Sequence, residues 1–362
     1  MLARMFCRLS KLTLLAIASL YCLAQAAPSL PRADAASEYV GYLFLHFYDN
    51  YRAPGDYSTY PAGEQVFGHL SNGNNPLPYR PLKGGAPLLR STVGTRGVRD
   101  FYLASRPDES QHYIIATDLN QTAAGGFGGA FLSRSLVIWD SKGSSLTQWE
   151  PPRLVEVVPP NFRMAWAPEA VWVAAKNQFM VFWASNAYGD ERHVGKPNED
   201  KIYRSFTSDF KTFTPPELYH ELPNGLNTID MTIHPTGGAS RPNEYVRFQK
   251  REDLGRCYGE VSENGIDGPW TRIGDDNSFV NPDSNGEACL FFQSNTNSAE
   301  WFVFVDQYGR NPAGYYPYLA VNGITKDGYR DLGLQELPKL LKHGTIKKVT
   351  RAQYDEIQAR WG

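Results

Sequence analysis

Short hydrophobic runs separated by polar turns recur along the chain, whereas helical periodicity is scarce. Most of these runs come in pairs of aromatic or β-branched segments joined by a turn, which is the pattern of antiparallel strands. The pairs are residues 101–103 and 112–117, 170–173 and 179–185, 231–233 and 245–248, and 289–292 and 301–305. A further strand-rich segment spans residues 39–48, and the clearest helix candidate is the segment 351–360.

An acidic residue precedes each of the four strand pairs. These acids are Asp100, Glu169, Asp230 and Glu287, at spacings of 69, 61 and 57 residues. A period of roughly 60 residues with several strands per unit indicates radial repetition, so we predict an all-β fold, a β-propeller. The first strand of each blade would then line the central channel and bring the four carboxylates together. The alternative is a set of ordinary turn acids, although four clustered carboxylates are costly without a function or a cation.

Composition and charge narrow the classes of function. The chain has 362 residues, 42% of them hydrophobic and 13% aromatic, so it can bury a core without disulfides or metals. Composition excludes collagen, coiled coils and disordered tails. The net charge is −2, from 36 basic and 38 acidic residues mixed along the chain, and gives no electrostatic signature of nucleic-acid binding.

The N-terminal segment predicts export. Arg4, Arg8 and Lys11 precede an apolar run over residues 12–23, and residues 24–26 (AQA) fit a cleavage site. The alternative is a membrane anchor, but the run is shorter than the ~20 residues that span a bilayer. We therefore expect a signal peptide over residues 1–26 and a secreted, extracellular protein without a membrane partner.

Export changes the meaning of two other features. Of the four cysteines, only Cys257 and Cys289 lie beyond the signal peptide, and an oxidising compartment favours a disulfide between them. The alternative is a buried pair of free thiols. Residues 120–122 (NQT) form an N-glycosylation sequon, so Asn120 is a candidate for a glycan.

Carboxylates gathered in one channel suit the hydrolysis of a glycosidic bond. This reaction needs one protonated carboxyl group that donates to the leaving oxygen and one ionised group. In inverting enzymes the ionised group activates a water on the opposite face of the sugar. A third carboxylate raises the pKa of the donor, and Trp166 supplies an aromatic face for a sugar ring, or else belongs to the core.

Five short motifs resemble those of one known family. They are residues 97–100 (GVRD), 113–117 (YIIAT), 166–169 (WAPE), 228–230 (TID) and 286–288 (GEA). Their order resembles glycoside hydrolase family 43 across residues 39–350. The resemblance implies a single five-bladed β-propeller domain over residues 27–362. It also implies an inverting enzyme that acts on arabinosides, arabinans, xylosides or galactans.

The resemblance assigns roles to individual residues. It implies that Asp100 is the general base, that Asp230 tunes the pKa of the proton donor, and that Glu287 is the general acid. It also implies that Trp166, Glu169 and Phe101 contact the substrate. Two positions depart from the family, which usually has proline where Phe101 and Cys289 stand.

The resemblance extends to a possible ion and to the substrate. Residues 342–345 (KHGT) are similar to a family segment whose histidine faces the channel near an ion or water, which makes His343 a candidate metal ligand. No cofactor is required, and a structural Ca²⁺ is the candidate ion. The substrate implied is an arabinose-containing plant cell-wall polysaccharide, cleaved by a monomer at α-L-arabinofuranosyl linkages. We expect the Gly-rich loop 123–129 near the channel mouth.

Three alternatives differ in function class. The first is a related enzyme that acts on xylosides or galactan, and the second is a propeller that binds glycans without chemistry. The third is a hydrolase of another kind, but the chain has no Gly-x-Ser-x-Gly elbow and no His-Glu-x-x-His motif.

Overall fold

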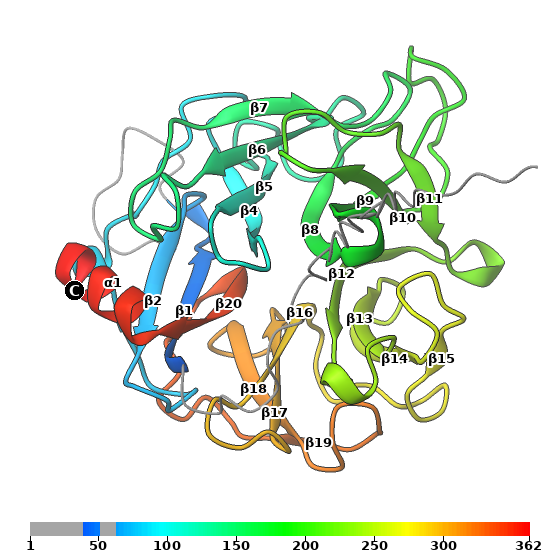
Figure 1. Cartoon of the computed structure of the whole chain (residues 1–362). Helices are drawn as coiled ribbons and strands as arrows, with labels where there is room; N and C mark the ends of the chain where they lie inside the picture. The colour runs from blue at the N-terminus through cyan, green and yellow to red at the C-terminus, as the bar shows by residue number, and fades with distance from the viewer. Residues whose placement is uncertain (1–38, 51–62) are drawn as a thin grey trace, which may run out of the picture. The chain divides into compact units, whose positions relative to one another are not determined.

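Five four-stranded antiparallel sheets surround a common axis in the computed structural model, which describes residues 39–50 and 63–362 (Figure 1). This arrangement confirms the predicted five-bladed β-propeller. The predicted signal peptide, residues 1–26, lies outside the described residues.

Each blade is one sheet, and the blades are numbered here in chain order. Blade 1 contains β1 (Tyr39–Phe47), β2 (Phe67–Ser71), β3 (Tyr79–Pro81) and β20 (Lys342–Thr350). Blade 2 contains β4 (Val98–Ser105), β5 (His112–Asp118), β6 (Ser135–Asp140) and β7 (Arg153–Glu156). Blade 3 contains β8 (Trp166–Val173), β9 (Gln178–Ser185), β10 (Lys201–Thr207) and β11 (Glu217–His220). Blade 4 contains β12 (Thr228–Pro235), β13 (Tyr245–Arg251), β14 (Arg256–Ser262) and β15 (Thr271–Arg272). Blade 5 contains β16 (Glu287–Gln293), β17 (Trp301–Gln307), β18 (Gly314–Ala320) and β19 (Tyr329–Asp331). The short 3₁₀ helices are η2 (Lys83–Gly85), η3 (Ala174–Lys176), η4 (Pro223–Gly225) and η5 (Gly238–Ser240).

The inner strands of the blades form a closed ring. Strands β4, β8, β12, β16 and β20 each contact the next, and β20 contacts β4 (Figure 1). In blades 2 to 5 the inner strand is the first strand of the unit, as predicted. In blade 1 it is β20, which explains why the segment 39–48 has no preceding acid: β1 is a second strand.

Strand β20 closes the ring by pairing antiparallel with β1. The helix α1 (Arg351–Trp361) follows directly, which confirms the predicted helix. It begins at a capping box, in which Thr350 and Gln353 satisfy each other's backbone N–H groups. Its buried face, Tyr354, Ile357 and Trp361, packs into a hydrophobic cluster shared by blades 1 and 2.

The hydrophobic core lies between the blades. Among the described residues, buried side chains form five clusters, and each cluster joins two neighbouring blades. Large rings fill these spaces, and Trp139, Trp183, Phe44 and Phe248 are fully buried. Each large side chain that is buried in this way contributes ~1.5–3 kcal/mol. Much of the high aromatic content is therefore explained by side chains that pack between the blades.

Cys257 and Cys289 are free thiols, so the predicted disulfide is not formed. Both side chains are buried in the cluster that joins blades 4 and 5, and they contact each other there. Burial raises the pKa of the Cys289 thiol well above its ordinary value. The pair therefore packs as small apolar side chains, which is the alternative left open by the sequence.

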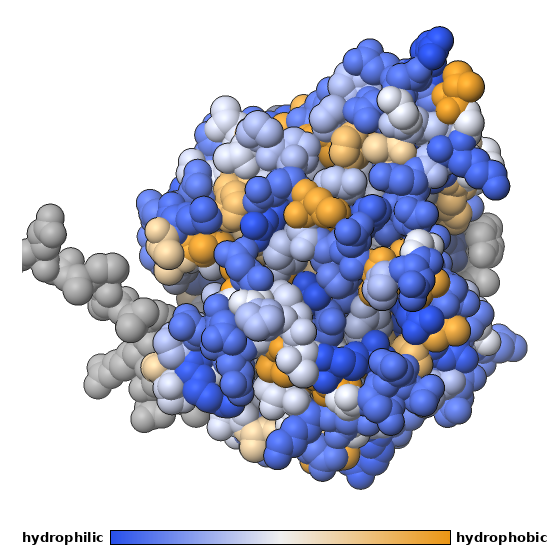
Figure 2. All heavy atoms as spheres, turned by 90° about the vertical axis from the view of Figure 1, so that its right-hand side faces the viewer, coloured by the Kyte–Doolittle hydropathy of each residue, from blue (hydrophilic) through white to orange (hydrophobic). Residues whose placement is uncertain are grey.

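Polar residues dominate the face of the molecule shown in Figure 2, and the apolar residues on it are scattered. Among the residues that the structure describes, no helix has the length and apolar character needed to cross a membrane.

Candidate active site

A β-bulge interrupts the inner strand of blades 2 to 5 at the same place. The register shifts fall between Arg99 and Tyr102, Trp166 and Glu169, Ile229 and Thr232, and Glu287 and Leu290. One residue in each bulge has a left-handed backbone: Asp100 (φ 52°), Ala167 (φ 48°), Asp230 (φ 54°) and Ala288 (φ 53°). This conformation costs a non-glycine residue ~1–2 kcal/mol, and bulges next to active sites re-aim side chains.

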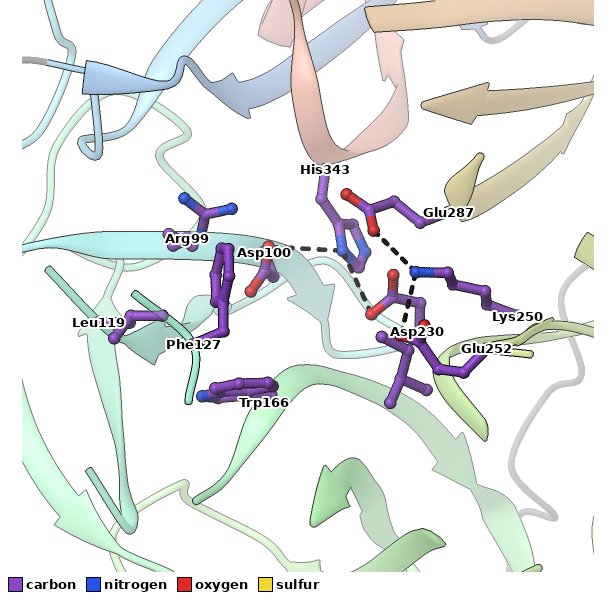
Figure 3. Close-up of a pocket in the computed structure, with 11 residues that line it drawn as sticks. Arg99, Asp100, Leu119, Phe127, Trp166, Asp230, Lys250, Glu252, Glu287 and His343 are labelled. Atoms are coloured by element: carbon purple, nitrogen blue, oxygen red, sulfur yellow. Dashed lines mark hydrogen bonds and ion pairs between the residues drawn. The ribbon is translucent and has the colours of Figure 1, made fainter. Parts of the chain in front are cut away.

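The bulges direct side chains from four blades into one pocket of about 260 Å³. They supply Arg99, Asp100, Trp166, Ile229, Asp230 and Glu287. The remaining lining residues are Leu119, Phe127, Lys250, Glu252 and His343 (Figure 3). The volume lies just below the ~300–1,000 Å³ typical of pockets for drug-sized ligands, so it suits a small unit such as one sugar.

The pocket brings together the three residues predicted to be catalytic. Asp100 on β4, Asp230 on β12 and Glu287 on β16 all line it, although 187 residues of sequence separate the first from the last. Trp166 lines the same pocket, and its contact with a substrate stays a prediction. The geometry therefore supplies several carboxyl groups and an aromatic face around one small space.

Glu169 is not among the residues that line this pocket, and its role as a substrate contact stays a prediction. In blade 3 the bulge position equivalent to Asp100 is Ala167, two residues before Glu169. Glu169 is 5% exposed, and burial raises its pKa well above the ordinary value. Its carboxyl group therefore lies in the protein interior, where burial favours the protonated form.

Phe101 is also placed differently from the prediction. Its side chain is 1% exposed and packs edge-on against Phe47, with ring centroids 6.0 Å apart. Because the bulge turns the preceding Asp100 toward the pocket, the next side chain points into the core between blades 1 and 2. Phe101 therefore supports the strand that carries Asp100 and has no place in the pocket lining.

His343 lies between two of the acids. Its Nδ1 is 3.5 Å from Asp100 Oδ1 and 3.9 Å from Asp230 Oδ1 (Figure 3). Burial lowers the pKa of the imidazole. In residues 39–50 and 63–362 no group of three or more His, Cys, Asp or Glu side chains is arranged to hold a metal ion. The ion near His343 therefore stays a prediction.

Two lysines contact Glu287. Lys250 Nζ on β13 lies 3.0 Å from Glu287 Oε2, and Lys342 Nζ on β20 lies 3.3 Å from Oε1. Burial acts to raise the pKa of Glu287, but Lys342 and Lys250 outweigh it and lower the pKa to about 2. In the free site Glu287 is therefore ionised, which is the opposite of the state that a proton donor needs.

Asp230 has the opposite tendency. Its Oδ2 accepts a hydrogen bond of 3.1 Å from the backbone N–H of Ala288, which ties blade 4 to blade 5. Burial and the neighbouring charge of Glu287 raise the pKa of Asp230 well above its ordinary value. Asp230 and Glu287 thus titrate as a pair, in which burial and the charge of Glu287 favour the protonated form of Asp230, while the lysines favour the ionised form of Glu287.

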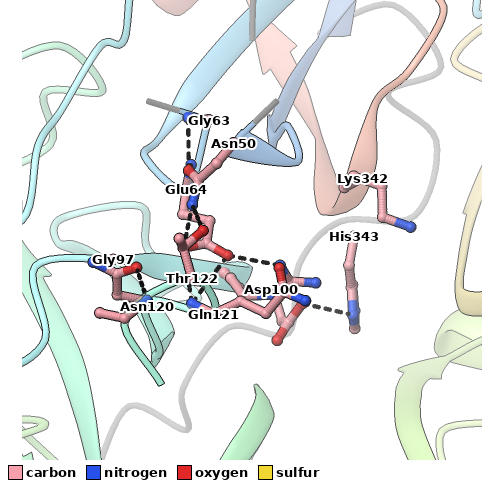
Figure 4. A network of polar contacts seen from close by, with 12 residues as sticks. Asn50, Gly63, Glu64, Gly97, Asp100, Asn120, Gln121, Thr122, Lys342 and His343 are labelled. Carbon is pink, nitrogen blue, oxygen red and sulfur yellow. Dashed lines mark hydrogen bonds and ion pairs between the residues drawn. The ribbon is translucent and has the colours of Figure 1, made fainter. Parts of the chain in front are cut away.

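A buried network supports the strand that carries Asp100 (Figure 4). Arg99 Nη1 donates to Glu64 Oε1 at 2.9 Å, and the guanidinium lies over the rings of Phe47 and Phe127. The Glu64 carboxylate also accepts from Asn50 Nδ2 at 3.0 Å and from the backbone N–H of Gln121. The network therefore joins blade 1 to the strand and the loop that border the pocket.

The Gly-rich loop lies at the pocket, as predicted. Phe127 lines the pocket and meets Trp166 edge-on, with ring centroids 5.9 Å apart. Arg163 holds the loop in place by donating from Nε to the carbonyl oxygen of Gly129 at 2.7 Å, and from Nη2 to that of Phe127. The sequon begins on the same loop, where Asn120 Oδ1 accepts from the N–H of Ala123, and its glycan stays a prediction.

The sequence motifs gave no site role to Arg99, Lys250, Lys342 or Glu252. Arg99 directly precedes Asp100 and Lys342 directly precedes His343, so both could have been found from those positions. Lys250 and Glu252 could not, because they belong to the second strand of blade 4 and the turn after it, where nothing in the local pattern marks them. Only the pairing of β12 with β13 brings them to the pocket.

The comparisons with known proteins agree with this fold. Residues 37–355 match the model of a family described as a probable glycosyl hydrolase domain, related to glycoside hydrolase family 43. The chain belongs to this family, which confirms the resemblance found in the sequence motifs.

Individual relatives are more distant. An alpha-L-arabinofuranosidase from Bifidobacterium longum subsp. longum is 27% identical over 206 residues, which cover 54% of this chain and 19% of the relative. The match thus spans about a fifth of the relative's length. A solved structure titled glycoside hydrolase is 13% identical and covers 84% of this chain and 92% of its own, with a TM-score of 0.50. The catalytic domain of a Coprinopsis cinerea α-L-arabinofuranosidase is 13% identical over 71% of this chain and 75% of its own, with a TM-score of 0.47. At these identities the structural likeness concerns the fold alone.

Proposed function

We propose that this protein is a secreted, inverting glycosidase that cleaves α-L-arabinofuranosyl linkages in plant cell-wall polysaccharides. Family membership supports the class of reaction, and the relative from Bifidobacterium longum supports the choice of sugar. The observation that carries the proposal is the single pocket in which inner-strand bulges place Asp100, Asp230 and Glu287 beside Trp166.

The proposed mechanism assigns one task to each carboxyl group. Asp100 removes a proton from a water that attacks the anomeric carbon, while Glu287 gives a proton to the departing glycosidic oxygen. The C–O bond to the leaving group breaks as the new C–O bond forms, so the configuration inverts. Asp230 stands next to Glu287 and exchanges the proton with it, and His343 holds Asp100 and Asp230 in place.

Product analysis with two site variants tests the proposal. The purified protein should release arabinose or arabino-oligosaccharides from branched or debranched arabinan or from arabinoxylan. Asp100→Asn and Glu287→Gln should each lower the rate by ~10²–10⁴-fold, because each removes a proton-transfer group. Glu336→Gln is the matched control. Glu336 is exposed and does not line the pocket, so this variant should retain full activity. Proton NMR of the first product should show the inverted anomer.

Two results would redirect the proposal. Release from galactan or xylosides in place of arabinosides would keep the enzyme and change the sugar. Retention of the initial anomer would reject the inverting mechanism and the role of Asp100 as base.

A glycan-binding propeller without chemistry is the second candidate, and one observation favours it. Lys250 and Lys342 keep Glu287 ionised in the free site, so binding without proton donation is compatible with the geometry. No product from any of these polysaccharides, together with measurable binding that Trp166→Ala abolishes, would support this candidate.

Export is supported by the charge and hydrophobicity of residues 1–26. If the proposal is correct, protein recovered from the medium of expressing cells begins at Ala27, as N-terminal sequencing would show.

A further inference from the structure

Lys250 is a buried cation with two carboxylate partners. Its side chain is 4% exposed, and its Nζ lies 3.0 Å both from Glu287 Oε2 and from Glu252 Oε1 (Figure 3). The two partners differ, because Glu287 belongs to blade 5 whereas Glu252 follows β13 in the same blade as Lys250. Lys250 thus bridges a predicted catalytic group and a neighbour that sequence reasoning did not single out.

A cation at this distance has a direct effect on a proton donor. An opposite charge within ~4–6 Å favours the ionised form of a carboxyl group and lowers its pKa by ~1–3 units. Lys342 also contacts Glu287, but its Nζ lies closer to Asp306 Oδ2, at 2.6 Å, than to Glu287 Oε1, at 3.3 Å. The other charged or titratable groups that face Glu287 from neighbouring elements are Arg99, Asp100, Asp230, Asp306, Tyr308 and His343.

Glu252 competes with Glu287 for the same ammonium group. Its side chain is 32% exposed and lines the pocket. A carboxylate beside Lys250 offsets part of the positive charge that Glu287 experiences. Removal of Glu252 and removal of Lys250 should therefore act on Glu287 in opposite directions.

We infer that Lys250 is a positioning residue that fixes the Glu287 carboxylate in the pocket and determines how readily this carboxylate takes up a proton. Glu252 offsets part of the positive charge of Lys250 and so opposes its effect on Glu287. The inference deepens the proposed glycosidase function and rests on it for its consequence in catalysis. The effect of Lys250 and Glu252 on the titration of Glu287 is a property of the free protein and can be measured without turnover.

The experiment measures the titration of Glu287 directly. Carboxyl ¹³C NMR of the protein labelled at glutamate, with the Glu287 signal assigned from Glu287→Gln, gives its pKa in each variant. Lys250→Met should raise the pKa of Glu287 by ~1–3 units, and Glu252→Gln should lower it. Lys250→Arg keeps the charge and should leave it nearly unchanged. Lys201→Met, which breaks the ion pair between Lys201 on β10 and Glu221 just after β11, is the matched control and should have no effect.

The pH profile of activity gives a second measurement. The alkaline limb reports the protonated donor, so it should move to higher pH in Lys250→Met and to lower pH in Glu252→Gln. Loss of structure alone would lower the rate without moving the limb in opposite directions. A Glu287 pKa that stays unchanged in both variants overturns the inference, even if the enzyme is active. Opposite pKa shifts in a protein without activity support it and reject only the glycosidase function.

Discussion

At the scale of single residues, the central feature is a pair of carboxyl groups in one pocket whose pKa values shift in opposite directions. Two lysines lower the pKa of Glu287, whereas burial and the charge of Glu287 raise the pKa of Asp230. The resemblance to glycoside hydrolase family 43 implies, and the proposed mechanism requires, that Glu287 donates the proton. Both statements hold if substrate binding weakens the lysine contacts and the proton passes from Asp230 to Glu287.

Leaving-group dependence identifies the donor. The nitrophenolate group of a nitrophenyl glycoside leaves without protonation, whereas the sugar oxygen that leaves in a natural glycan must be protonated by the general acid. Glu287→Gln should therefore lose ~10²–10⁴-fold in kcat/KM on arabinan or arabinoxylan and retain most of its activity on the aryl glycoside. Asp230→Asn should lower both activities by similar factors. The reverse pattern, with rescue only in Asp230→Asn, would assign donation to Asp230.

At the scale of elements, a repeated bulge builds the site. The strand pairs and the helix could be predicted from the sequence because each of them depends on a local pattern of hydrophobic runs and turn residues. The bulges could not, because a register shift depends on how one strand pairs with the next. This is why the sequence placed Glu169 in register with Asp100, whereas the structure places Ala167 there, and why Phe101 lies in the core.

The strain in the bulge can be measured by comparing two alanines on β8. Ala167 has a left-handed backbone, whereas Ala170 does not, and both are buried. Each Ala→Gly change loses a methyl group, at a cost of ~0.8 kcal/mol, and adds chain entropy to the unfolded state. Only Ala167→Gly also relieves ~1–2 kcal/mol of strain.

Denaturant unfolding should therefore show that Ala170→Gly lowers the free energy of unfolding by about 1–2 kcal/mol, while Ala167→Gly changes it by less than about 1 kcal/mol. Equal losses in the two variants would mean that the bulge stores no strain.

At the scale of the whole molecule, the ring is held closed by β20 and α1. Ile357 is fully buried in the cluster that joins blades 1 and 2, and the Glu356 carboxylate accepts from the hydroxyl group of Thr147 in blade 2. The helix thus secures the one blade that combines strands from distant parts of the chain. Loosening it should open blade 1 before the others.

Ile357→Ala tests this closure. Removal of the buried side chain should lower the free energy of unfolding by ~2–5 kcal/mol, whereas Gln358→Ala, at an exposed position of the same helix, should change it by less than ~0.5 kcal/mol. Hydrogen–deuterium exchange should become faster in β1 and β20 than in blade 4. Uniform acceleration in every blade would show instead that the propeller opens as one unit.

The late position of β20 also has a consequence for synthesis. Of the twenty strands in the part of the chain that the structure describes, this strand leaves the ribosome last, and it carries Lys342 and His343. A nascent chain can therefore have four folded blades and still lack a complete pocket. Whatever chemistry the protein performs begins only when the last inner strand is in place, so the fold itself delays activity until translation of this region is complete.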